Sequence, residues 1–163
     1  MRKTLPAAAL MTVAILILAC AESEGQNAGA GTTSECQPLN VPDIDRTGDI
    51  MHAAGFDVSR ETASDGRAAL VWRLDGSNAT ISVGAGGTNL NVAFRLGGTA
   101  SENAVNSWND DQEFARTYLD RDGSPVLEMD LDFEGGICED NVRAFFRTSA
   151  SRYGHWKLNV PGK

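Results

Sequence analysis

The chain has 163 residues, with 14 Lys and Arg against 22 Asp and Glu, which gives a formal net charge of −8 at pH 7. Such an acidic surface repels phosphate backbones and anionic headgroups, and this argues against nucleic-acid binding. The charge is compatible with a basic partner, although acidity alone usually indicates only solubility.

The first 20 residues have the pattern of an export signal. Arg2 and Lys3 precede an apolar run from Leu5 to Ala19, which is shorter than the ~20 residues of a membrane span. The run ends in ILAC, which resembles a bacterial lipobox, where Cys20 is acylated and becomes the mature N-terminus. We therefore expect a signal peptide over residues 1–20 and a lipoprotein that is anchored in the bacterial envelope and faces the periplasm.

A second cleavage site for the signal peptide is the alternative. The stretch ACA at residues 19–21 also fits the small-x-small rule of ordinary signal peptidase, and cleavage after Ala21 would release a soluble periplasmic protein. For the lipidated form, Ala21 in place of an aspartate favours the outer membrane, by resemblance to enterobacterial sorting. Two or more acyl chains are enough for stable anchoring. Either cut removes Arg2 and Lys3, which takes the formal net charge from −8 to −10.

Residues 21–37 are predicted to be a flexible linker, and residues 38–160 one folded domain. The stretch AESEGQNAGAGTTSE lacks aromatic and branched aliphatic residues, so it cannot bury enough apolar surface to fold. Cys36 and Cys138 then remain as an even pair in an oxidising compartment, and we expect a disulfide between them. Two separate thiols are the alternative. A redox role for Cys138 is a further one, because a helix N-terminus lowers thiol pKa.

The domain begins with a predicted helix and a predicted meander. The helix opens near Asp43 and stops at Gly55, with Ile44, Ile50 and Met51 on its apolar face. Four apolar runs follow, FDVSRET, AALVWRL, ATISV and LNVAFRL, and turn residues separate them. This pattern predicts three or four antiparallel strands.

A second helix, a hairpin and a third helix complete the expected domain. Ser101 is predicted to cap the second helix, which turns Val105 and Trp108 inward. FARTYLD and PVLEMDLDF flank an Asp-Gly turn signal and predict a hairpin. The last helix is expected from about Glu139 to Tyr153. The result is an α+β domain of order α-β-β-β-α-β-β-α, in which helices pack on an antiparallel sheet.

The hairpin decides how its alternating acids are interpreted. A two-residue loop at residues 122–123 would pair Leu119 with Val126. One face would then hold Phe114, Arg116, Tyr118, Leu127, Met129, Leu131 and Phe133, and the other would hold Glu113, Thr117, Glu128, Asp130 and Asp132. A straight strand spreads its carboxylates about 7 Å apart in a line, whereas a calcium site gathers them round a loop. We therefore expect a solvated strand face, and neither a metal site nor a catalytic site.

The sequence carries no strong signal for catalysis or a cofactor. Its two histidines, His52 and His155, give no basis for a Ser-His-acid triad, and the GAGG stretch at residues 84–87 lacks the Lys-Ser/Thr of a phosphate loop. Cys36 and Cys138 lack the spacing of a zinc site. We expect no enzyme, no metal and no cofactor.

From Asn106 to Gly136 the chain resembles the YbjN family, often labelled bacterial sensory transduction regulators. The matching residues are Asn106, Trp108 and Asn109 of NSWN, then FARTYLD, the Asp-Gly turn, VLEMDLDFEGG and the acidic opening of the last helix. The resemblance implies the fold of type III secretion chaperones. It also implies a non-enzymatic binding or regulatory module, with a protein or peptide partner and a homodimer as expected assemblies. The export signal and added cysteines depart from the plain domain, so a cytoplasmic role does not carry over unchanged.

The expected function is that of a non-enzymatic envelope lipoprotein that binds a protein or peptide. Trp72, Phe114, Arg116 and Tyr118 are the candidate contact residues. Core packing is the alternative for Trp72 and Phe114, and snorkelling over the sheet is the alternative for Arg116. A small acidic periplasmic inhibitor or ligand-sensing domain is the alternative function, and a thiol redox protein is a further one.

Overall fold

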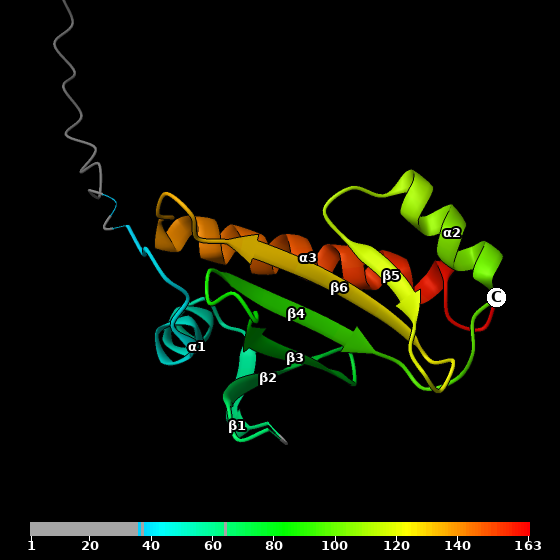
Figure 1. Cartoon of the computed structure of the whole chain (residues 1–163), viewed down its shortest axis with the longest axis horizontal. Helices are drawn as coiled ribbons and strands as arrows, with labels where there is room; N and C mark the ends of the chain where they lie inside the picture. Colours follow the sequence, from blue (N-terminus) through cyan, green and yellow to red (C-terminus); the bar gives the residue numbers. More distant parts are fainter. Residues whose placement is uncertain (1–35, 37, 64) are drawn as a thin grey trace, which may run out of the picture. The chain divides into compact units, whose positions relative to one another are not determined.

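The computed structural model describes residues 36, 38–63 and 65–163. The predicted signal peptide, Cys20 and most of the predicted linker lie outside the described residues. The described residues form an α+β domain with three helices and a six-stranded antiparallel sheet (Figure 1), which confirms the predicted fold class. Among them, no helix combines the length and the apolar character that crossing a membrane requires.

Two of the helices begin at the capping residues that the sequence predicts. α1 (Ile44–Ala53) is capped by Asp43, whose carboxylate accepts a hydrogen bond from the Arg46 amide at 2.9 Å. α2 (Glu102–Asp111) is capped by Ser101, whose hydroxyl oxygen accepts a hydrogen bond from a backbone amide at 3.1 Å. Each cap satisfies a donor that the first helical turn leaves without a partner.

The sheet combines a meander with a hairpin. Its strands are β1 (Asp57–Thr62), β2 (Ala68–Leu74), β3 (Ser77–Val83), β4 (Asn89–Arg95), β5 (Arg116–Leu119) and β6 (Pro125–Asp132). The spatial order is β1-β2-β3-β4-β6-β5, so the meander has four strands, the larger of the two predicted numbers. Because β6 joins β4, β1 and β5 are left at the two edges of the sheet.

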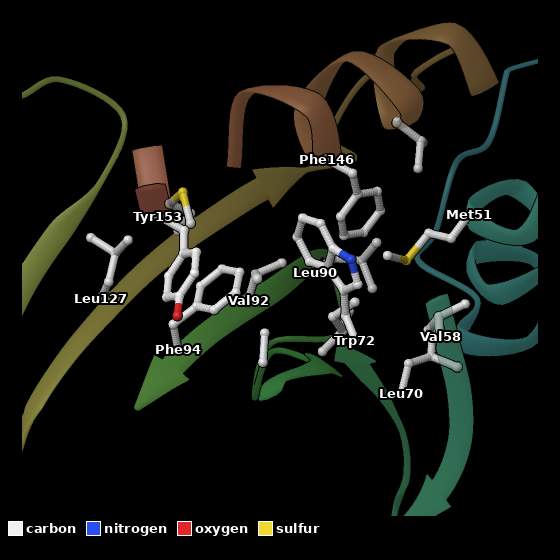
Figure 2. Packing of buried hydrophobic residues seen from close by; sticks show 14 of the residues in the cluster. Met51, Val58, Leu70, Trp72, Leu90, Val92, Phe94, Leu127, Phe146 and Tyr153 are labelled. Atoms are coloured by element: carbon white, nitrogen blue, oxygen red, sulfur yellow. The ribbon is translucent and has the colours of Figure 1, made fainter. Parts of the chain in front are cut away.

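All three helices pack on one face of the sheet. α3 (Glu139–Asn159) runs behind β6 in Figure 1. Its buried stripe is Val142, Phe146, Ser149, Tyr153 and Trp156. Trp72 of β2 lies 5.7 Å from Phe146 and 5.5 Å from Phe94 between ring centroids, and Phe94 stacks on Tyr153 at 4.3 Å (Figure 2). The helix continues past the predicted end at Tyr153 because Trp156 places one more buried ring on the same stripe.

The start of the domain is attached to the start of α3. Leu39 and Ile137 form an isolated antiparallel bridge, with N–H to O=C distances of 2.8 and 3.0 Å. Beside this bridge the structure joins Cys36 to Cys138 in a disulfide, with their Cα atoms 5.4 Å apart. Cys36 is exposed and Cys138 is half-buried. The bond therefore lies near the surface, where it closes most of the domain into one loop.

The loop of the β5–β6 hairpin differs from the predicted two-residue turn. The Asp120 amide donates to the Ser124 carbonyl at 3.0 Å, which leaves three residues, 121–123, in the loop. The Asp120 carboxylate accepts hydrogen bonds from the amides of Asp122 and Ser124, both at 2.9 Å. Gly123 has a φ of +79°, the left-handed conformation expected of glycine in a three-residue hairpin loop.

The added loop residue makes the predicted register wrong by one position. Thr117 pairs with Leu127, where the prediction placed Glu128 opposite it. β6 keeps its predicted faces, but β5 is turned over, because a slip of one residue exchanges the two faces of a strand. Thr117 is buried under the helices, and Arg116 and Tyr118 lie on the acidic face.

Candidate functional site

The face of the sheet opposite the helices is open in the described part of the chain, and we call it the open face. It is mainly polar over strands β4, β6 and β5. Its side chains there include Asn89, Asn91 and Arg95 of β4, Glu128, Asp130 and Asp132 of β6, and Arg116 and Tyr118 of β5. The acids therefore lie on the solvated face, as the sequence predicts, although Arg116 and Tyr118 join them there.

Two acids of the open face, Glu128 and Asp130, are paired with side chains of the neighbouring strands. Asp130 accepts hydrogen bonds from the amide groups of Asn89 at 2.8 Å and Asn91 at 3.1 Å, and Glu128 also accepts one from Asn91. The guanidinium of Arg116 lies 3.0 Å from Glu128 and 3.9 Å from Asp130. These five side chains form a continuous polar network across β4, β6 and β5.

Two side chains of the open face, Glu128 and Tyr118, have pKa values that their surroundings shift. Burial raises the pKa of Glu128, but hydrogen bonds from Arg116 and Asn91 and the charge of Arg116 outweigh it, so that the pKa lies below its usual value. Burial and the nearby Glu128 carboxylate raise the pKa of Tyr118. Both values move away from neutrality, whereas an acid–base catalyst needs a pKa near the working pH. These two shifts therefore give no sign of a group tuned for proton transfer.

The histidines lie apart from this network. His52 is exposed on α1, and His155 of α3 packs against Trp108 of α2 with ring centroids 5.3 Å apart. Over residues 36, 38–63 and 65–163, no group of three or more His, Cys, Asp or Glu side chains is placed to hold a metal ion.

Three of the four predicted contact residues, Phe114, Arg116 and Tyr118, are exposed in β5 or just before it. Phe114 is 78% exposed and Tyr118 is 40% exposed, and Arg116 lies between them in sequence. Phe114 and Arg116 line a shallow depression with Glu128 and Asp130. Core packing is thus contradicted for Phe114. Trp72 is 1% exposed and belongs to the core, so the core alternative holds for Trp72, and this side chain is not available to a partner.

Sequence reasoning missed the role of Asn109. Its carboxamide accepts a hydrogen bond from the Thr117 amide at 2.8 Å and donates one to the Thr117 carbonyl at 2.9 Å. These are backbone groups on the edge of β5 that faces away from β6, so α2 closes this edge where a further strand could otherwise pair. The NSWN motif marks the residue as notable, but only the tertiary structure assigns it this task.

Thr117 also connects β5 to α3. Its hydroxyl donates to the Val126 carbonyl at 2.7 Å and accepts a hydrogen bond from the Trp156 indole at 2.9 Å. Thr117 is therefore held by α2, β6 and α3 together. The motif residues Asn109 and Thr117 therefore have a structural role. The exposed side chains next to Thr117 are those of Arg116 and Tyr118.

Comparisons with known proteins agree with this architecture. The YbjN family, described as "Putative bacterial sensory transduction regulator", matches residues 43–153. The solved structure titled "Crystal structure of YbjN, a putative transcription regulator from E. coli" aligns with a TM-score of 0.57 at 14% identity, over 77% of this chain and 99% of that chain. At such low identity this likeness shows the fold alone. No curated protein matches. Since the family match spans more than half of the sequence, the chain belongs to the YbjN family.

Proposed function

We propose that the chain is a non-enzymatic binding or regulatory module of the bacterial envelope, which binds a protein or peptide through Phe114, Arg116 and Tyr118. The proposal includes export, lipidation at Cys20 and a domain that faces the periplasm, with the outer membrane as the favoured location. The family description supports a regulatory role. The acidic chain and its export signal favour an envelope role over binding to nucleic acid.

The observation that carries the proposal is the exposure of Phe114. The Phe114 ring, which is 78% exposed, contributes little to the core. It is close in sequence to the partly exposed Tyr118 and the charged Arg116. Aromatic residues and arginine are the types enriched where proteins bind one another, and they carry a large share of the binding energy. This group is therefore the best candidate for a contact surface among the described residues.

The closed edge of β5 favours recognition through side chains. Addition of a partner strand needs free backbone N–H and C=O groups at the sheet edge. At Thr117 both groups are already bonded to Asn109. A partner at this end of the sheet would then contact the exposed side chains on the open face and at its rim.

Photo-crosslinking in intact cells tests the contact surface. A photoreactive phenylalanine analogue is placed at Phe114 or Tyr118, and at Leu158 as a matched control, since Leu158 of α3 is 74% exposed. We expect one dominant adduct from the first two positions and none of the same mass from Leu158. Adducts with copies of the chain alone would assign the surface to a homodimer, and equal adducts from all three positions would reject the proposed site.

Fractionation tests the proposed location separately. We expect metabolic labelling of the full chain with a fatty acid and loss of that label in Cys20→Ala, with the protein released from the membrane. Cys36 and Cys138 are expected to resist alkylation until a reductant is added. Fatty-acid label that persists in Cys20→Ala would contradict acylation at Cys20, and retention of the parent chain in the cytoplasm would contradict the envelope assignment. Neither result bears on the contact surface.

The same crosslinking separates the binding module from a thiol redox protein. In a Cys36→Ser/Cys138→Ser double variant, a binding module keeps its adduct at Phe114 if the domain remains folded. A redox protein that depends on Cys138 would lose its activity in this variant although its fold is retained.

A further inference from the structure

The open face contains a polar depression that the proposed contact surface does not account for. It has a volume of about 380 Å³, within the range of roughly 300–1,000 Å³ that small-molecule sites occupy. It extends from β3 to β5, and the polar side chains that line it include Ser82, Asn89, Asn91, Arg116, Glu128 and Asp130. A site of this composition recognises a ligand mainly through hydrogen bonds.

The side chains in the middle of the depression converge on one carboxylate. The Nδ2 groups of Asn89 and Asn91 donate to the same oxygen of Asp130, at 2.8 and 3.1 Å. In the described part of the chain, no hydrogen bond reaches the Oδ1 atoms of the two asparagines. The other oxygen of Asp130 lies 3.9 Å from Arg116, beyond hydrogen-bond distance. The free groups are therefore acceptors, gathered round Asp130.

Gly84 gives the Asn89 side chain the room that it needs. A Cβ atom at position 84 would overlap the carboxamide of Asn89. Gly84 does not have a positive φ, so its backbone conformation does not require glycine. The absence of a side chain at Gly84 thus lets Asn89 lie in the depression and bond to Asp130. A side chain that is oriented before binding loses less entropy when a ligand binds.

The charges that line the depression balance one another. Arg67 and Arg116 are positive, and Glu128 and Asp130 are negative, so the formal charges of the lining add to zero. Arg67 is bonded to Asp65 at 2.7 Å, and Arg116 lies 3.0 Å from Glu128. A strongly charged ligand would find each opposite charge engaged or offset, whereas neutral hydroxyl groups can donate to the free acceptors.

The clustering of the acceptors separates a sugar from an extended peptide. Hydroxyl groups on adjacent carbons of a pyranose ring lie side by side, so they can donate together to acceptors around one carboxylate. Backbone N–H groups on one side of an extended peptide recur only every second residue, about 6.6 Å apart. The free oxygens around Asp130 therefore fit a pyranose better than an extended peptide.

The depression continues to Phe114. A second hollow of about 360 Å³ shares Arg116, Glu128 and Asp130 with the first and extends to Phe114. The Phe114 ring is 78% exposed, at a φ of +63° that bulky residues rarely adopt. The face of an aromatic ring is electron-rich and attracts weakly positive C–H groups, such as those on one face of a pyranose. The second hollow thus offers packing for a second sugar unit.

We infer that the open face binds a neutral oligosaccharide of pyranose units. One unit donates its hydroxyl groups to Asn89, Asn91 and Asp130, and the next unit packs its C–H face on Phe114. Arg116 donates to a hydroxyl oxygen through Nη1, because its Nε and Nη2 atoms are bonded to Glu128. The inference goes beyond the proposed protein-binding function and does not rest on it.

Calorimetric titration tests the inference. The full chain is kept in micelles of a detergent without a sugar headgroup and titrated with maltotetraose, cellotetraose, mannotetraose and chitotetraose. We expect at least one of these neutral sugars to bind with a Kd of about 1 mM or tighter, at an affinity that salt does not change. Anionic tetragalacturonate should bind at least about tenfold more weakly. The preference between hexose and N-acetylhexosamine probes identifies the source of the sugar.

Two substitutions locate the site. Asn91→Ala removes a carboxamide and should weaken binding of the best neutral probe about tenfold or more. Gly84→Ala removes no polar group, but it displaces the Asn89 carboxamide and should also weaken binding about tenfold. The matched controls are Asn78→Ala, at an exposed position of β3 outside the depression, and Gly97→Ala, where a Cβ meets no atom within 4 Å. Both controls should bind as the parent does, and circular dichroism checks that each variant is folded.

The opposite results would overturn the inference. These are no binding of any neutral probe, binding that survives both Asn91→Ala and Gly84→Ala, or equal losses in the two control variants. Tighter binding of tetragalacturonate would contradict the neutral ligand. None of these results bears on the crosslinked adduct from Phe114, so failure of the inference is distinguished from failure of the proposed function.

Discussion

The two faces of this sheet are formed by the same strands but differ in chemistry. The covered face packs Trp72, Phe94 and Tyr153 into a continuous group of rings under α3. The open face, one residue further along each strand, carries amides, carboxylates and guanidinium groups that are bonded to one another. The covered face thus stabilises the fold by burial of apolar surface, while the open face provides a polar surface whose side chains are already ordered.

The two faces meet at β5, where the exposed aromatic surface lies. Thr117 faces the helices and is bonded to Trp156, and its neighbours Arg116 and Tyr118 face solvent. Phe114 comes just before the strand. Among the described residues, two of the four exposed large hydrophobic side chains, Phe114 and Tyr118, lie at this edge of the sheet, beside the elements that order it; the other two are Val41 and Leu158.

Truncating one ring from each region should give the largest contrast. Trp72→Ala is expected to lower the free energy of unfolding by about 3–5 kcal/mol, because it leaves a cavity among Phe94 and Phe146. Phe114→Ala should change it by less than about 0.5 kcal/mol, as for other exposed positions. Urea unfolding followed by circular dichroism measures both. Similar losses for the two variants would mean that Phe114 is part of the core and would break the comparison.

Removal of the Asn109 side chain should have the next largest effect. Asn109→Ala leaves the N–H and C=O of Thr117 without partners at the edge of β5, and we expect a loss of about 1–3 kcal/mol in the free energy of unfolding. Hydrogen exchange at the Thr117 amide should become faster. Asn106→Ala, an exposed position in the same motif, is the control and should be nearly neutral. Unchanged exchange at Thr117 would show that the edge does not depend on Asn109.

Acidification should remove the stabilising contribution of the polar network on the open face, while the apolar packing of the covered face has no carboxylate to protonate. The pKa of Glu128 is lower in the folded chain than its ordinary value, so its ion pair with Arg116 stabilises the fold above about pH 4.3, the unfolded value. This stability is lost as the pH falls through the folded pKa. We expect at most about 1 kcal/mol, because solvent screens the partly exposed pair.

Urea unfolding between pH 7 and pH 3 measures this effect. The Glu128→Gln variant should lose less stability on acidification than the parent chain does, since it has no carboxylate to protonate at this position. Glu61→Gln, at an exposed position of β1, should follow the parent. A parallel pH dependence of Glu128→Gln and the parent would remove the open-face network as a source of stability.

The smallest effect tests the strain at Phe114. At a φ of +63° glycine avoids the steric cost that alanine retains, but it loses more backbone entropy on folding. We expect Phe114→Gly to be more stable than Phe114→Ala by about 0.5 kcal/mol. Both variants should lose the crosslinked partner. A glycine variant that is less stable than the alanine variant would show that the left-handed conformation is not maintained in solution.

Local patterns in the sequence predicted most of the fold. The caps Asp43 and Ser101 mark two helix starts, because a short polar side chain at that position satisfies a free amide wherever the helix lies. The alternation of apolar and acidic residues along β6 also predicted correctly that Glu128 and Asp130 lie on the solvated face. The error arose at Asp122-Gly123, which suits a two-residue loop as well as a three-residue one. The carboxylate of Asp120 favours the longer loop through its bonds to two amides.

The sequence by itself determined the acidic charge, the element types and the periodic core faces, since these depend on residues close together along the chain. Only the tertiary structure decided which side of β5 faces the helices, how Asn109 closes its edge and why Phe114 is exposed. These features depend on contacts between distant segments, such as the bond from Trp156 to Thr117 across 39 positions. Such contacts form only when the helices pack on the sheet, and no local pattern encodes them.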